Sequence, residues 1–148
     1  MTTKKKPRRI AGDIPVRDYA AEQTSTLLRR LAFQASRTAK MPDPDAVHDL
    51  RVPIRRLAQC LRVFNQFFPR QRNRKIQQKL EAVMDLASEV RNRDIALMLL
   101  ASAPPLSDSS LLQMLALERT EAEKSLVAAL ERWNRRGFHK KWRSRLGL

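Results

Sequence analysis

The chain has 148 residues with a single cysteine, and its 30 Lys and Arg residues against 15 Asp and Glu residues give a formal net charge of +15 at pH 7. One cysteine excludes an intramolecular disulfide and a thiolate metal cluster, and no apolar run approaches the ~18 residues that a membrane span requires. Such a positive charge predicts a polyanionic partner: nucleic acid, an anionic membrane surface, a phosphate polymer or an acidic protein.

The N-terminal residues 1–13 differ in composition from the rest of the chain. They carry five Lys and Arg residues together with a proline and a glycine, a composition that cannot build a packed core. We therefore expect a basic flexible arm at 1–13 and one helical domain at 14–148. Cys60 as the only cysteine and the absence of an apolar signal segment favour a cytoplasmic protein.

Apolar residues spaced by three and four predict four amphipathic helices of roughly twenty residues each. We place these helices at 16–40, 44–68, 75–100 and 109–136. The second helix could instead begin at Pro53, but its apolar spacing continues across that residue. No stretch shows the alternation of a β-strand, so we predict an all-α fold, an antiparallel four-helix bundle. Gly137 ends the last helix, and a basic tail follows with Phe138 and Trp142 as free aromatic side chains.

The segment 47–68 carries two rows of side chains that lie one position apart. The first row is apolar and consists of Val47, Leu50, Ile54, Leu57, Leu61, Phe64 and Phe68. The second row is cationic and consists of His48, Arg51, Arg55 and Arg62. Each member follows an apolar position, so the cationic row borders the buried face of the helix. Several guanidinium groups are thereby placed within reach of one elongated anion.

Two charged residues interrupt the apolar faces of the later helices. Asp94 lies in the apolar face of the third helix and needs a partner. Arg91 and the cationic row are the candidates, so we interpret Asp94 as a residue that orients guanidinium groups. Arg119 interrupts the fourth helix, where an unpaired charge would be costly. It either extends to the rim or points into the same anion groove.

The sequence shows few of the residue patterns that are typical of catalytic or metal-binding sites. The chain has no glycine-rich phosphate loop, no HExxH helix and no Glu-x-x-His pair. His48 stands near Asp45 and Asp49, but Asp49 lies about 100° around the helix, which prevents chelation. We therefore predict that the protein is not an enzyme and uses no cofactor and no metal.

Two motifs of the chain resemble the signatures of a known family, the CHAD domain. They are VHDLRVPIRRL, with LRVF after it, and EVRNRDIALMLL further along the chain. The resemblance implies an all-helical protein that binds inorganic polyphosphate through a basic groove or pore. The matching residues are His48, Arg51, Arg55, Arg56 and Arg62 in the first motif, and Arg91, Asn92 and Asp94 in the second.

Family members usually contain two helical halves, whereas this sequence carries one copy of the signature. We therefore expect one half of a two-bundle architecture and a homodimer that places two arginine rows across a shared groove. The predicted function is polyphosphate binding, with phosphate or sulfate able to occupy the same site. Its predicted ligands are His48, Arg51, Arg55, Arg56, Arg62, Arg91 and Arg119, with Asp94 orienting them. Such a protein could associate with polyphosphate granules.

The alternative function is nucleic-acid binding by a basic helical protein. Proteins that read RNA or single strands normally offer exposed aromatic side chains for base stacking. In the predicted bundle only Phe138 and Trp142 lie outside the core, which favours polyphosphate over RNA or DNA.

Overall fold

The computed structural model describes residues 15–102 and 109–148, and these residues are all-helical. The elements are α1 (Val16–Lys40), α2 (Pro44–Val63), the short 3-10 helix η2 (Asn65–Phe67), α3 (Arg70–Ala101), α4 (Ser109–Arg135) and α5 (Phe138–Leu146). The all-α prediction is confirmed, and these ranges hold five α-helices where the sequence pattern predicted four. None of their helices is long and apolar enough to cross a membrane.

The start of α2 agrees with the sequence signals. The Asp43 side chain accepts a hydrogen bond from the Ala46 N–H at 2.8 Å, and Pro44 occupies the first helical position. The helix passes through Pro53 without ending, so the alternative start at that residue is wrong. Its end comes earlier than predicted, at Val63, and η2 follows.

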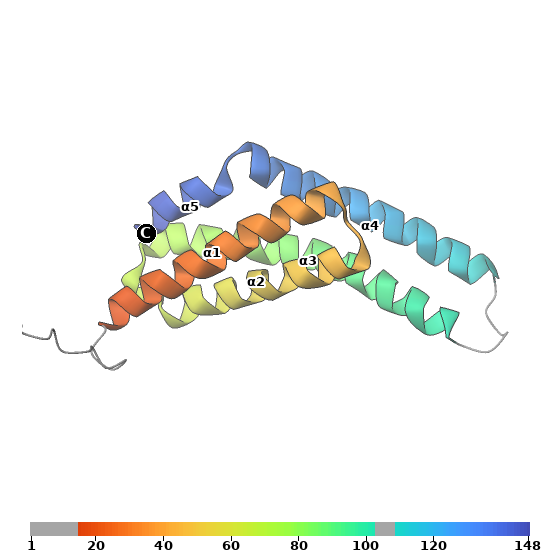
Figure 1. Cartoon of the computed structure of the whole chain (residues 1–148), viewed down its shortest axis with the longest axis horizontal. Coiled ribbons are helices and arrows are strands. Elements are labelled where there is room, and N and C mark those ends of the chain that lie inside the picture. The colour runs from red at the N-terminus through yellow and green to blue at the C-terminus, as the bar shows by residue number, and fades with distance from the viewer. Residues whose placement is uncertain (1–14, 103–108) are drawn as a thin grey trace, which may run out of the picture.

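Four helices form a closed set of neighbours around the core. α1 packs against α2 and α4, and α3 packs against the same two helices. The apolar row of α2 is almost wholly enclosed, as its spacing predicted. Figure 1 shows that the far ends of α3 and α4 extend together past the connection between α1 and α2. We call this paired extension, residues 95–102 and 110–117, the α3–α4 arm.

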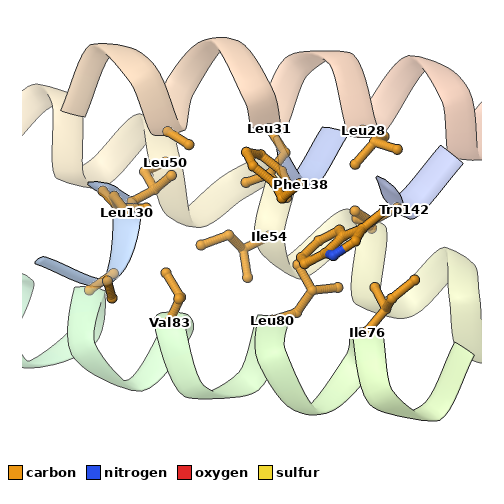
Figure 2. Close-up of a cluster of buried hydrophobic side chains, with 14 of the residues drawn as sticks. Leu28, Leu31, Leu50, Ile54, Ile76, Leu80, Val83, Leu130, Phe138 and Trp142 are labelled. Atoms are coloured by element: carbon orange, nitrogen blue, oxygen red, sulfur yellow. The ribbon is translucent and has the colours of Figure 1, made fainter. Parts of the chain in front are cut away.

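The segment predicted as a basic tail is instead helix α5. Its Phe138, Trp142 and Leu146 are spaced by four, lie on one helix face and are 5%, 2% and 3% exposed. Figure 2 shows the two aromatic rings among core side chains of α1 and α3. Gly137 ends α4 in the left-handed region, with φ at 61°, so the predicted helix stop is confirmed. The prediction of free aromatic side chains at Phe138 and Trp142 is wrong.

Candidate functional site

Three arginines interact with one another where α2 packs against α3. They are Arg51 and Arg55 on α2 and Arg91 on α3, and we call them the arginine cluster. Burial, and then the positive charges of Arg55 and Arg91, lower the pKa of the Arg51 guanidinium below its ordinary value. Arg51 Nε is buried and has no hydrogen-bond partner in the structure. Among the described residues, no ion pair includes a member of the cluster.

The local sequence explains why these charges lie beside the core. Each arginine of the cluster directly follows an almost fully buried aliphatic residue, and these are Leu50, Ile54 and Val90. A step of one residue turns a helix by about 100°, which carries the side chain from the core to its border. Because α2 and α3 pack along these stripes, the two borders meet. The cluster is therefore positioned by the same contacts that build the core.

The remaining cations of the α2 row lie on either side of the cluster. His48 is exposed and comes one helical turn before Arg51. Arg62 and Arg55 line a cavity of about 490 Å³ between α2 and α3, together with Glu81 and Asp85. These two carboxylates would repel an anion inside this cavity, which makes its interior less favourable for phosphate than the cluster at Arg51 and Arg91.

Arg56 lies away from the cluster, in a cavity between α1 and α2. This cavity has a volume of about 660 Å³ and is also lined by Arg29, Arg30, Phe33 and Asp49. Phe33 is 66% exposed, so the prediction that only Phe138 and Trp142 lie outside the core is wrong. The sequence pattern that could have indicated this surface is the pair Arg29 and Arg30 followed by an aromatic residue one helical turn later. The structure thus places Arg55 and Arg56 in different cavities.

Arg119 and Asp94 form a network that joins three parts of the chain. Arg119 Nε donates to Asp94 Oδ1 at 2.9 Å, and Arg119 Nη2 donates to the Pro42 carbonyl at 2.7 Å. Its Nη1 donates to Glu123 on the next turn of α4. The candidate partners of Asp94 predicted from the sequence are Arg91 and the α2 row, and the structure gives Arg119 instead. Each nitrogen of Arg119 therefore has an acceptor within the chain.

The chemistry that this arrangement supports is oxyanion binding. Guanidinium groups form short, charge-assisted and often bidentate hydrogen bonds to phosphate oxygens. Within the described ranges, no group of three or more His, Cys, Asp or Glu side chains is arranged to hold a metal ion. The cluster thus offers donors for an anion.

Comparison with known families agrees with the motifs on α2 and α3. Residues 18–147, which run from α1 to α5, match the model of the CHAD domain. The chain belongs to the CHAD domain family. No curated protein and no solved structure matches it. CHAD domains are associated with the binding of polyphosphate.

In this CHAD domain the two signature motifs meet at the arginine cluster. The motif on α2 supplies Arg51 and Arg55, and the motif on α3 supplies Arg91. Asn92, the next residue of the second motif, is exposed. The fold brings the three arginines of the cluster together. Arg56 lies instead in the cavity between α1 and α2, and Arg119 lies in the network with Asp94. The binding role of each of these residues stays a prediction.

Proposed function

We propose that this CHAD domain binds inorganic polyphosphate at the arginine cluster and has no enzymatic activity. The observation that carries the proposal is the state of Arg51. Its Nε is buried without a partner, and its pKa is lowered by burial and by Arg55 and Arg91. A phosphate group placed among the three guanidiniums would supply the missing acceptor and offset their mutual repulsion.

The residues around the cluster take different roles in this proposal. Arg51 is the inner ligand, and Arg55 and Arg91 flank it on α2 and α3. His48 adds an exposed donor one turn away, so that a polymer can extend along α2. Arg119 acts as a positioning residue through Asp94, since it holds α4 against α3.

The test is the affinity for polyphosphate of the double variant Arg51→Ala, Arg55→Ala. Each lost charge-assisted bond weakens binding, so the pair should bind at least about tenfold more weakly. Circular dichroism should show unchanged helicity. The matched control is Arg29→Ala, Arg30→Ala, which removes the same charge from the cavity between α1 and α2. Equal weakening in both double variants would show attraction by overall charge and reject the cluster as the site.

Nucleic-acid binding remains the second candidate function, and one observation favours it. Phe33 is exposed beside Arg29 and Arg30, and an aromatic ring among cations suits base stacking. Against it, the core encloses Phe138 and Trp142. Competition at fixed salt between labelled polyphosphate and a mixed-sequence oligonucleotide decides between the two. We expect polyphosphate to displace the oligonucleotide, and the opposite order would support nucleic acid.

We further propose that two copies of the chain associate through the α3–α4 arm, each copy acting as one half of a two-bundle assembly. The α3–α4 arm exposes six large apolar side chains, which are Ile95, Met98 and Leu99 on α3 and Leu111, Met114 and Leu117 on α4. The described residues 95–102 and 110–117 include no charged side chain. In a chain of net charge +15, this surface lets a second copy approach without repulsion between cations.

Light scattering over a range of protein concentrations tests the dimer. We expect a mass that rises from one copy toward two, and the variant Leu99→Glu, Leu117→Glu should remain a monomer because it places charge on the α3–α4 arm. The control Val63→Glu changes an exposed apolar residue on α2 and should still dimerise. A wild-type monomer at every concentration would end this proposal while leaving the arginine cluster untouched.

A further inference from the structure

A second cationic cavity lies between α3, α4 and α5, on another side of α3 from the arginine cluster. Its volume is about 470 Å³. Five cations line it: Lys79, Arg132, Arg136, Lys141 and Arg145. Its lining includes no carboxylate, and no ion pair within the described ranges involves any of the five. The cavity therefore concentrates positive charge that no carboxylate of the described residues neutralises.

The crowding of these charges shows in Lys79. Burial, followed by the charges of Arg145, Arg136 and Lys141, lowers the pKa of its ammonium group below the ordinary value. Solvated charges on an open surface repel one another weakly because water screens them. Here the charges come from two sides, α3 on one and α4 with α5 on the other, and they converge on one hollow. A bound anion would relieve that repulsion.

The inner wall of the cavity is aromatic. Trp133, Phe138 and Trp142 line it, and each pair of their rings has a centroid separation of 5.0 Å. Phe138 and Trp142 are buried, whereas Trp133 is only partly covered and keeps part of its surface open. Short aliphatic side chains of α3 continue the apolar wall, among them Ala82 and Val83. An anion alone would need no such surface.

We propose that this cavity binds a nucleoside phosphate, with the base against the uncovered part of Trp133 and the phosphates among the cations. The two parts of the cavity correspond to the two parts of such a ligand, since planar bases stack on aromatic rings and phosphates pair with Arg and Lys. The volume falls within the roughly 300–1,000 Å³ typical of small-molecule sites. This site is separate from the proposed polyphosphate site, because Lys79 and Ala82 face it while Glu81 and Asp85 face the cavity between α2 and α3.

Intrinsic fluorescence provides a direct readout, because the chain has 2 tryptophans and both line this cavity. The full chain is titrated without magnesium with ATP and, separately, with inorganic tripolyphosphate, which has the same phosphates but no base. Excitation at the red edge and a free-tryptophan control correct for absorption by the base. We expect a saturable change with ATP and at least about tenfold weaker binding of tripolyphosphate, since base stacking contributes roughly 1–3 kcal/mol.

Two matched variants locate the binding. Arg136→Gln, Arg145→Gln removes two cations from the cavity and should weaken ATP at least about tenfold, whereas Arg51→Gln, Arg55→Gln should change ATP by less than about threefold. Polyphosphate affinity, measured on the same proteins, should show the opposite order. No saturable change with ATP, equal affinity for tripolyphosphate, or equal losses in both variants would each overturn the nucleoside phosphate site. None of these outcomes depends on whether polyphosphate binds at the arginine cluster.

Discussion

Two arginine sites lie beside α3, the single Arg119 and the arginine cluster, and they differ in the partners of their guanidinium groups. Arg119 is 16% exposed and bonds to Asp94, which is 6% exposed, as well as to Glu123 and the Pro42 carbonyl. The arginine cluster is also partly withdrawn from water at Arg51, but Arg51 Nε has no hydrogen-bond partner among the described residues. Arginine thus occurs in two environments of this helical domain, an ion-pair network at Arg119 and a cluster of like charges at Arg51.

The difference suggests a way to distinguish an arginine that stabilises the fold from the arginines that we propose bind an anion. A paired buried arginine stabilises the fold against the loss of its partner, because removing either charge leaves the other uncompensated. An unpaired cluster opposes folding slightly and gains its counter-charge only when an anion binds. Stability measurements and binding measurements should therefore separate the two groups.

The largest effect is expected at the paired arginine. Arg119→Met should lower the free energy of unfolding by about 3 kcal/mol, because buried Asp94 loses its counter-charge. Urea denaturation measures this. The control is Arg62→Met, at an exposed arginine without an ion pair among the described residues, and it should change the value by about 0.5 kcal/mol or less. The double variant Arg119→Met, Asp94→Leu should recover much of the loss. A decrease below about 1 kcal/mol in the single variant would mean that the network contributes little.

A smaller effect is expected from ligand binding, and it should depend on the arginine cluster rather than on Arg119. Polyphosphate at a hundred times its dissociation constant should stabilise the wild type by about 2.7 kcal/mol, because it binds only the folded state. Arg119→Met should start from a lower melting temperature and show a similar increase. Arg51→Ala, Arg55→Ala should start no lower than the wild type and show little increase. If Arg119→Met lost the increase and the cluster variant kept it, the assignment of the two groups would be reversed.

The smallest effect is the pH dependence of the unfolding free energy that His139 contributes. Its Nε2 is buried without a partner, and burial, then Arg143 and Arg29, lower its pKa below 6.5. As pH falls below about 6.5, the unfolded chain binds this proton before the folded one does, so the stability contributed at higher pH is lost. His139→Gln should reduce the fall in unfolding free energy between pH 7 and 5.

The matched control for that measurement is His48→Gln, at the exposed histidine of α2. Because the carboxylates also titrate in this range, the quantity to compare is the slope of each variant against the wild type. An unchanged slope in His139→Gln, or a wild type that gains stability on acidification, would contradict the unpaired state of His139.

The sequence predicted α2 well because several independent signals agree there. An unbroken apolar row, the Asp43 cap and Pro44 at the first position all indicate the same helix. Helix α5 was missed because it is short, 9 residues, with one apolar residue per turn among cations. Its stability comes from packing against α1, α3 and α4, which no local pattern reveals.

The site was predictable where it depends on position along one helix, and not where it depends on contacts between helices. Arg51 and Arg55 follow buried residues of α2, so their border position could be derived from spacing alone. Arg56 lies a further 100° or so around the same helix, which places it in another cavity. Asp94 and Arg119 were each recognised as charges in an apolar face, but only the packing of α3 against α4 pairs them.

The bond from Arg119 to the Pro42 carbonyl has a consequence for the order of folding. It joins residues 77 positions apart and fastens the connection between α1 and α2 to α4. The α1–α2 and α3–α4 hairpins close short loops and can form locally, whereas this bond requires that both have already docked. We therefore expect it to be absent from the folding transition state. Its removal should accelerate unfolding and leave the folding rate almost unchanged. Arg119 would then contribute to the kinetic stability of the folded state without affecting how fast that state forms.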